Sequence, residues 1–288
     1  MSTWTLKNLA NQTGKRVLIT GASSGIGMHA ANQLAAKGAT VFAAVRNVEK
    51  ARAVLRPEIE IFHLDLADLG NVYRFATKFN QEIDVLLNNA GVMATPLKRT
   101  PQDFELQMGT NHFGHFALTG RLLPQIKDRV VTVSSLAHRM GKINLDDINW
   151  ERSYSRWPAY GQSKLANLLF TSELDARFKA AGDKRRAIAV HPGYSDTNLQ
   201  GNTEKSAQDK VMRWMNKVIA QSALQGAEPS LYAITEDVPG NSFIGPDGFM
   251  GMKGHPTFAD RSAQAQDMKM AKALWKLSEE LTGVVFPL

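Results

Sequence analysis

The stretch Gly21-Ala22-Ser23-Ser24-Gly25-Ile26-Gly27 decides the fold that we predict for this chain of 288 residues. It follows the strand-like residues 16–20 and precedes the helix-like residues 28–35. Glycines allow a tight turn and a close approach to a pyrophosphate, and the new helix offers unpaired N–H groups to that anion. Three glycines also occur in ordinary surface turns, but the strand before and the helix after them favour a nucleotide site in a βαβ unit.

The composition is that of a soluble globular protein, with 43% hydrophobic and 21% charged residues. Cysteine is absent, which excludes disulfides and thiolate metal sites and fits a reducing compartment. We find no signal peptide and no apolar run long enough to span a membrane, and we expect a cytoplasmic protein without a metal.

The net charge of +7 raises the question of a nucleic-acid partner. The longest basic run, within residues 183–186, is short, so we read the charges as solvated helix faces and expect no nucleic acid. A phosphate-rich cofactor would be favoured by the same positive field.

Strand-like and helix-like segments alternate, as a parallel sheet with crossover helices requires. We expect further strands at residues 40–45, 60–64, 84–87, 129–133 and 187–190. We therefore predict an α/β protein with a Rossmann-type doubly wound parallel sheet and helices on both faces, as a single domain over residues 1–288. Residues 14–193 would form the cofactor-binding and catalytic core, 194–225 a substrate lid and 226–288 the C-terminal completion.

Apolar residues at helical spacing predict the remaining elements. We expect helices over residues 101–123, from Pro158 towards Gly182, over 205–221 and over 223–235, and a last strand at 241–244 before a loop at 245–248. A final helix with the apolar face Met270, Leu274, Leu277 and Leu281 should end at Gly283. The Met and Trp residues within 205–221 suit an apolar substrate, although such residues more often belong to a core.

The second strand ends at Val45-Arg46, where a site that prefers NAD usually has an acid for the ribose hydroxyls. Here the acid is absent and a cation follows. Arg46 suits the 2′-phosphate of NADP, so we predict NADP (NADPH) as the cofactor and favour NAD less. The alternative is that Arg46 is an ordinary surface residue at a strand end.

Polar and small residues also follow the later strands, at the edge where open parallel sheets bind ligands. Asp65, next to Leu66, suits the adenine amino group, or else it caps the helix that begins near Asp68. Asn88-Asn89-Ala90-Gly91 offers amides that fix strand ends and a low surface for a ribose, with an ordinary Asn-rich turn as the alternative.

Tyr160 and Lys164 are four residues apart and share a face of the predicted helix. At about 5 Å and an effective dielectric of about 20, the ammonium favours the tyrosinate by roughly 3 kcal/mol, about two pKa units. Tyr160 would then exchange a proton with an alcohol or carbonyl oxygen that Ser135 also holds, and Asn111 would anchor a water that feeds Lys164. The spacing alone also occurs on solvated helix faces, so its value depends on the context.

The chain resembles the short-chain dehydrogenase/reductase family, because its motifs fall in the family's order. These motifs are Thr20-Gly21-x-x-x-Gly25-x-Gly27, Asp65, Asn88-Asn89-Ala90-Gly91, Asn111, Ser135, Tyr160-x-x-x-Lys164 and Pro192-Gly193. The resemblance implies a catalytic tetrad of Asn111, Ser135, Tyr160 and Lys164. It also implies that Lys164 holds the nicotinamide ribose and that Thr197 contacts the carboxamide or phosphate.

Residues 133–138, 160–167 and 279–283 are similar to the subgroup of retinol dehydrogenases and WW-domain oxidoreductases. The membrane anchor of many retinol dehydrogenases has no counterpart at the N-terminus, which argues against a retinoid substrate and a membrane location. The family resemblance also implies a homo-oligomer.

We therefore expect an NADP-dependent oxidoreductase that moves a hydride between nicotinamide and the alcohol or carbonyl carbon of an apolar small molecule. A non-catalytic NADP-binding sensor or scaffold is the alternative, but its mark would be a damaged tetrad, and here the tetrad is whole.

Overall fold

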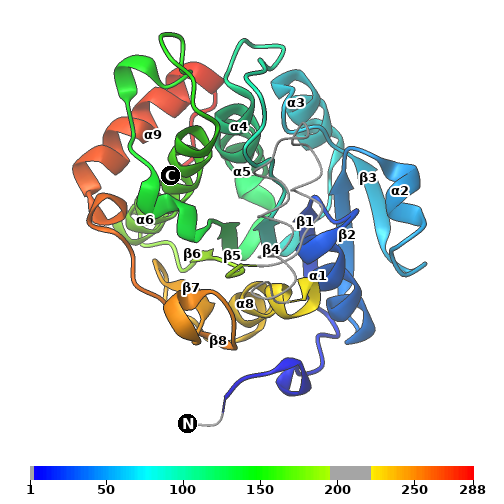
Figure 1. Ribbon diagram of the computed structural model, residues 1–288. Helices are drawn as coiled ribbons and strands as arrows, with labels where there is room; N and C mark the ends of the chain where they lie inside the picture. The colour runs from blue at the N-terminus through cyan, green and yellow to red at the C-terminus, as the bar shows by residue number, and fades with distance from the viewer. Residues whose placement is uncertain (1–2, 195–221) are drawn as a thin grey trace.

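The structure, a computed structural model, describes residues 3–194 and 222–288. One eight-stranded sheet with the order β3-β2-β1-β4-β5-β6-β7-β8 forms its centre (Figure 1). All neighbouring strands are parallel except β8, which runs antiparallel to β7. The strands are β1 Arg16–Thr20, β2 Thr40–Val45, β3 Glu60–His63, β4 Ile83–Asn88, β5 Ile126–Val133, β6 Arg186–Val190, β7 Phe243–Pro246 and β8 Pro256–Phe258. The predicted Rossmann-type sheet is confirmed.

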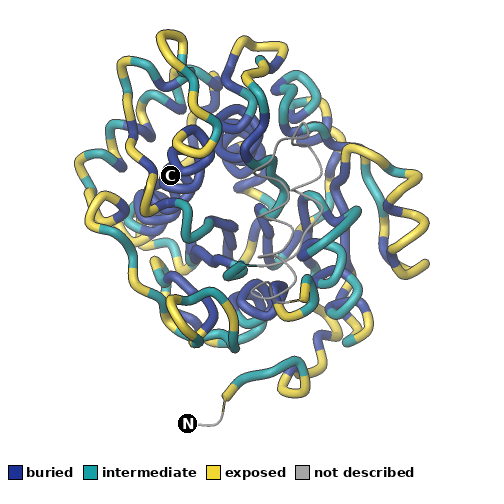
Figure 2. The backbone as a smooth tube through the Cα atoms, viewed as in Figure 1, coloured by how far each residue is buried: buried dark blue, intermediate teal, exposed yellow. Residues whose placement is uncertain are grey.

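Successive side chains of the central strands enter two separate cores, one on each face of the sheet. Leu18 of β1 belongs to one core, and its neighbours Val17 and Ile19 belong to the other. This alternation follows from the pleat, and because both faces are covered, the strands read as continuous apolar runs. In Figure 2 the buried backbone accordingly lies along the sheet and the helices next to it, with exposed segments around them.

Helices cover both faces of the sheet (Figure 1). One core contains residues of α1 (Gly25–Ala36), α2 (Val48–Arg52) and α8 (Ala223–Thr235). The opposite core contains residues of α3 (Leu69–Lys78), α5 (Gly114–Leu122), α6 (Arg156–Ala180) and α9 (Met268–Thr282). Within the described ranges, no helix combines the length and the apolar character that crossing a membrane requires.

The helix predicted over residues 101–123 begins later than expected. The backbone turns at residues 100–104, where Asp103 has φ +62° and the Thr100 and Phe104 backbones pair. Glu105 then caps α4 (Leu106–Met108) by accepting hydrogen bonds from the backbone N–H groups of Gln107 and Met108. A π-helical turn, Gly109–Phe113, separates α4 from α5.

The C-terminal third agrees with the prediction at its helices but not at its strands. Helix α8 has the predicted bounds, and Gly283, with φ +64°, ends α9 as expected. Strand β7 begins at Phe243 because Asn241 turns the chain with φ +63°, and it includes residues that we assigned to a loop. Strand β8 was not predicted, and the helix expected over 205–221 lies outside the described residues.

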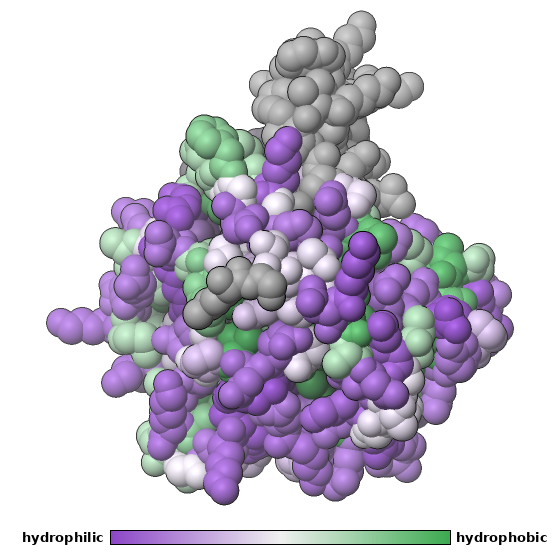
Figure 3. All heavy atoms as spheres, turned by 90° about the horizontal axis from the view of Figure 1, so that it is seen from below, coloured by the Kyte–Doolittle hydropathy of each residue, from purple (hydrophilic) through white to green (hydrophobic). Residues whose placement is uncertain are grey.

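Most of the face shown in Figure 3 is hydrophilic, with apolar residues in small separate groups.

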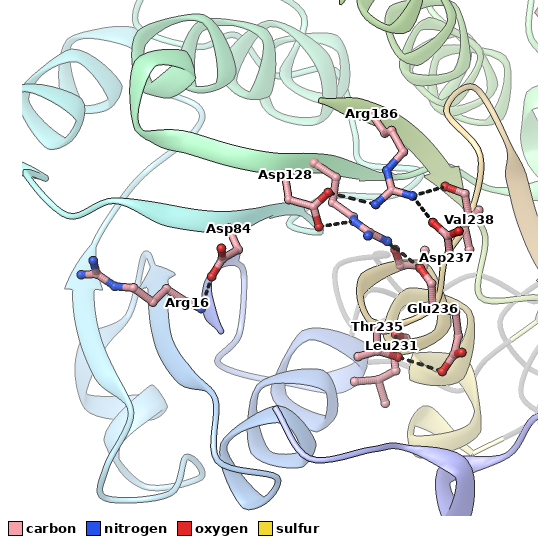
Figure 4. A network of polar contacts seen from close by, with 11 residues as sticks. Arg16, Asp84, Asp128, Arg186, Leu231, Thr235, Glu236, Asp237 and Val238 are labelled. Carbon is pink, nitrogen blue, oxygen red and sulfur yellow. Dashed lines mark hydrogen bonds and ion pairs between the residues drawn. The ribbon is translucent and has the colours of Figure 1, made fainter. Parts of the chain in front are cut away.

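Helix α8 is tied to the sheet by charged groups at the ends of strands, drawn in Figure 4. The buried Arg129 donates through Nη1 to the carbonyls of Ala233 (2.9 Å) and Glu236 (2.7 Å), and through Nε to Asp128 (2.9 Å). Arg186 donates to the other oxygen of Asp128 at 3.0 Å. Since the last carbonyls of a helix lack intrahelical partners, Arg129 supplies the missing donors.

This geometry predicts that Arg129→Met lowers the free energy of unfolding but leaves the carboxyl ends of the strands unchanged. The loss of charged donors to two carbonyls should cost about 2–3 kcal/mol, which in a chain of 288 residues corresponds to a fall in Tm of roughly 3 to 5 °C. Arg152→Met, which removes an exposed arginine 3.8 Å from Asp147, is the matched control and should change Tm little. Equal melting temperatures of the two variants would contradict this role of Arg129.

Candidate active site

A cleft of about 430 Å³ lies at the carboxyl ends of the parallel strands. Most of the predicted site residues line it: Gly21, Ser23, Ser24, Gly25, Ile26, Gly27, Arg46, Asp65, Leu66, Asn89, Ala90, Gly91, Tyr160, Lys164 and Pro192. The lining also includes residues that we did not predict, namely Ala44, Asn47, Lys50, Leu64, Val92, Thr110, Val133 and Ser134. Segments far apart in the sequence therefore converge at one edge, as expected for an open parallel sheet.

The glycine turn fits closely against the end of β4. A Cβ atom at Gly21, whose φ is +70°, would lie 2.8 Å from the Cα atom of Ala90. A Cβ atom at Gly27 would lie 2.4 Å from Nδ2 of Asn89. Larger residues would therefore push the turn away from β4, and the first turn of α1 opens directly onto the cleft. This cradle fits the pyrophosphate of a dinucleotide.

The two asparagines that follow β4 have different surroundings. Asn89 donates to the carbonyl of Thr20 at 2.7 Å and lines the cleft. Asn88 is buried and donates to Thr119 at 2.9 Å, so its side chain is not part of the cleft lining. Gly193, with φ +67°, is also outside the lining, and Thr197 lies outside the described residues.

Two cations line the cleft beyond the end of β2. Arg46 follows the strand directly, and Lys50 stands in helix α2, which Asn47 caps with a 2.8 Å bond to the Lys50 backbone. Sequence reasoning missed Lys50, although its spacing of one helical turn from Arg46 was a usable signal.

Asp65 lines the cleft just after the end of β3. Its Oδ1 accepts from the backbone of Ala67 at 3.0 Å. Its own N–H donates to Asn71 at 2.9 Å. The residue that caps α3 is Asp68, so the alternative interpretation of Asp65 as that cap is wrong.

Tyr160 and Lys164 lie in the first turns of α6, both almost fully buried. Ser135, at the end of β5, makes a side-chain hydrogen bond with Tyr160. Lys164 Nζ donates to the carbonyl of Val133 at 3.1 Å and lies 5.8 Å from the centre of the Tyr160 ring. The structure thus brings the predicted phenol, hydroxyl and ammonium together, although Ser135 itself is outside the cleft lining.

The acidity of this pair differs from our expectation. Burial raises the pKa of Tyr160 to about 12, and only the Ser135 hydrogen bond opposes it. Burial also lowers the pKa of Lys164 to about 8. Because both side chains are removed from water, each neutral form is favoured. Our prediction that Lys164 would lower the pKa of Tyr160 is therefore wrong for the protein alone.

Asn111 lies in the π-helical turn, and its side chain has protein partners at every polar atom. It exchanges two hydrogen bonds with the backbone of Val92 and donates a third to Ser163. These bonds hold the chain after β4, so the side chain positions the loop rather than lining the cleft. The backbone carbonyl of Asn111 accepts a hydrogen bond from Nδ1 of His115 at 3.0 Å. The water that we expected at Asn111 stays a prediction.

A family model described as short chain dehydrogenase matches residues 15–208. The chain belongs to the short-chain dehydrogenase family. It is 38% identical over 300 residues to human retinol dehydrogenase 13, covering 95% of this chain and 86% of that protein. It is also 38% identical over 287 residues to human retinol dehydrogenase 11, covering 94% and 86%. The protein is accordingly an oxidoreductase that acts on CH–OH or C=O groups.

Solved structures share the fold of this chain. An uncharacterized protein from Mycobacterium paratuberculosis is 48% identical, with a TM-score of 0.87 and full coverage of both chains. A short chain dehydrogenase from Shigella flexneri, complexed with NADP, shares the fold at 24% identity and a TM-score of 0.62, covering 82% of this chain and 98% of that one. The predicted family and fold are confirmed.

The low pKa of Lys164 predicts a pH dependence. The charged form should be lost as the pH rises through about 8. The value of kcat/KM for the cofactor, which reports the free enzyme, should fall over the same range. ¹⁵N NMR of Lys164 Nζ in the cofactor-free protein measures this directly. A titration midpoint near the ordinary value, above pH 10, would contradict the prediction.

Proposed function

We propose that this protein is an NADP(H)-dependent oxidoreductase that transfers a hydride between nicotinamide and the alcohol or carbonyl carbon of an apolar small molecule. One observation carries the proposal: a single cleft has a buried Tyr160–Lys164 pair in one part of its lining and Arg46 with Lys50 in another. When bound, the cofactor supplies or accepts the hydride, and the chain provides the binding groups and the proton.

The two cations favour NADP over NAD. Asp65 is the one acidic residue among those that line the cleft in the described part of the chain, and it follows β3 rather than β2. Arg46 and Lys50 would therefore hold a 2′-phosphate by charge-assisted hydrogen bonds. The glycine turn and the first N–H groups of α1 would hold the pyrophosphate.

Tyr160 would pass its proton to the oxygen of a carbonyl substrate while Ser135 donates a hydrogen bond to the same oxygen. A pKa of about 12 keeps the phenol protonated at neutral pH, which is the state that carbonyl reduction needs. Lys164 would hold the ribose and add positive charge beside the phenol. Oxidation of an alcohol needs the tyrosinate form, so the positive charge of the bound oxidised cofactor would first have to lower the pKa of Tyr160.

An apolar substrate is supported by the surface beside Tyr160. The partly exposed Trp157 meets the Tyr160 ring edge-on at 6.2 Å between ring centres. Two human relatives are named retinol dehydrogenases, which act on an apolar alcohol by that name. We infer an apolar aldehyde or ketone as the substrate class.

Several earlier expectations stay predictions: a cytoplasmic location, a homo-oligomer, the division at residues 193 and 225, and contacts of Pro192, Gly193 and Thr197 with the cofactor. The alternative of a non-catalytic NADP sensor has no support, because Asn111, Ser135, Tyr160 and Lys164 are all present.

Tyr160→Phe should abolish reduction of an apolar aldehyde, measured by NADPH absorbance, because no other buried phenol lines the cleft in the described residues. NADPH binding should be nearly unchanged. Tyr154→Phe is the matched control: Tyr154 is half-buried and its pKa is likewise raised to about 12, but it donates to the carbonyl of Thr95 and does not line the cleft. Undiminished turnover by Tyr160→Phe would remove this residue from the reaction.

Arg46→Asp should shift preference from NADPH towards NADH, and adding Lys50→Ala should increase the shift. Losing one charge-assisted hydrogen bond of about 1.5–3 kcal/mol raises the NADPH dissociation constant roughly tenfold or more. Arg52→Asp is the control, because Arg52 is on the same short helix as Lys50 but does not line the cleft. Fluorescence titration gives the constants, and an Arg46 variant that matches the Arg52 variant would refute the assignment.

A further inference from the structure

His115 is a buried imidazole between the two halves of the site, and neither the family motifs nor the cleft lining includes it. Its Nδ1 lies 3.0 Å from the carbonyl oxygen of Asn111. Its Nε2 lies 2.9 Å from the hydroxyl oxygen of Thr20. Both ring nitrogens therefore have partners. Nδ1 contacts the backbone of the π-helical turn before α5, and Nε2 contacts the side chain at the end of β1.

The partners settle where the ring proton is. A carbonyl oxygen only accepts, so Nδ1 carries the hydrogen that Asn111 receives. Thr20 Oγ1 already accepts from the backbones of Asn89 (2.9 Å) and Ala90 (3.0 Å). With both lone pairs used, the hydroxyl donates its hydrogen to Nε2 rather than to the more distant carbonyl of Leu87 at 3.4 Å. His115 is consequently a neutral imidazole in the Nδ1–H tautomer.

Each bond of His115 reaches a different function of the site. On one side, Thr20 holds the Asn89 and Ala90 amides, against which the glycine turn packs. On the other side, His115 donates to the backbone carbonyl of Asn111, four residues earlier in the chain. The side chain of Asn111 lies beside Gly91, where a Cβ atom would be 3.1 Å from Oδ1 of Asn111 and 3.5 Å from Nζ of Lys164. His115 is the one imidazole in the described residues that bonds to both Thr20 and Asn111.

We propose that His115 is a positioning residue that joins two parts of the site. Through Thr20 it contacts the end of β4, against which the glycine turn packs, and through the Asn111 backbone it contacts the π-helical turn Gly109–Phe113. It must stay neutral to do so, because a second ring proton would face a hydroxyl that has no free lone pair. Complete burial lowers the pKa of His115 to about 4, with a further contribution from the charge of Lys164, and the hydrogen bond to the Asn111 backbone opposes the shift only in part. The other group that faces it, Thr20, does not titrate, and His112 is itself held neutral by burial.

Two conservative variants separate the two bonds. Asn places its amide near the position of Nδ1, so His115→Asn keeps a donor for the Asn111 carbonyl and loses the Thr20 contact. Gln places its amide near Nε2, so His115→Gln keeps an acceptor for Thr20 and loses the Asn111 contact. His115→Leu loses both. His112→Asn is the control for removing a buried histidine, since His112 stands in the preceding π-helical turn and bonds to Ser278 of α9.

The expected result is a split between binding and turnover, which rests on the proposed function. The Asn variant should raise the NADPH dissociation constant about tenfold with kcat less affected, and the Gln variant should lower kcat about tenfold with binding less affected. The Leu variant should lose both, while His112→Asn should lower Tm without separating binding from turnover. Equal losses of both quantities in the Asn and Gln variants, or no loss in any, would overturn the proposal.

A measurement without turnover tests the same assignment. In ¹⁵N NMR of the cofactor-free protein, His115 should remain neutral, with the proton on Nδ1, from pH 5 to pH 8 (about the range in which a free histidine titrates). An Nε2–H tautomer, or titration within this range, would overturn the proposal. If the wild-type protein reduces no apolar carbonyl compound with NADPH, the proposed function fails, but the tautomer and the NADPH dissociation constants still decide the role of His115.

Discussion

The close contact between the glycine turn and the end of β4 is the constraint on which the site depends. Gly21 approaches Ala90 so closely that no side chain fits between them, and the Thr20 hydroxyl binds the two amides that follow β4. Such a short separation is possible only where the backbone adopts a positive φ without a Cβ atom. The floor of the cleft is therefore made of backbone, and the helix that follows is aimed at the anion that the floor supports.

Burial gives the catalytic pair its character before any cofactor is considered. Tyr160 and Lys164 are both almost completely removed from water, and no carboxylate contributes to the shift of either pKa. The site thus keeps a neutral phenol and an ammonium whose charge is easily lost. The phenol is therefore protonated at neutral pH, but a pKa of about 12 makes it a weaker acid than a free tyrosine. An ammonium with carboxylate partners would be held charged, and its field on the phenol would be partly cancelled.

The sequence predicted the parts of the fold and site that depend on local pattern. Apolar runs bounded by glycine and polar residues located β1, β2 and β6 to within a residue, and helix α8 has its predicted bounds. Errors occurred where an unrecognised turn or a strand pairing decides: the turn at Asp103 and the cap at Glu105 delay the helix before α5, and β8 exists because it pairs with β7. Likewise, Asn88 turns towards Thr119, and burial, which no spacing reveals, sets the acidity of Tyr160.

The same strands carry stability at one end and chemistry at the other. In β5, Arg129 binds the end of α8, while Val133 accepts hydrogen bonds from Lys164 and Asn167. In β1, the Arg16 backbone donates to Asp84 at one end (Figure 4), and Thr20 orders the cradle at the other. Between these ends the side chains of both strands are buried and mostly apolar. A substitution at one end could reach the other by shifting the strand register, which the closely packed cores on both faces resist. Within the carboxyl edge, the proposed connection between the glycine turn and the π-helical turn of Asn111 is a buried neutral imidazole with one donor and one acceptor.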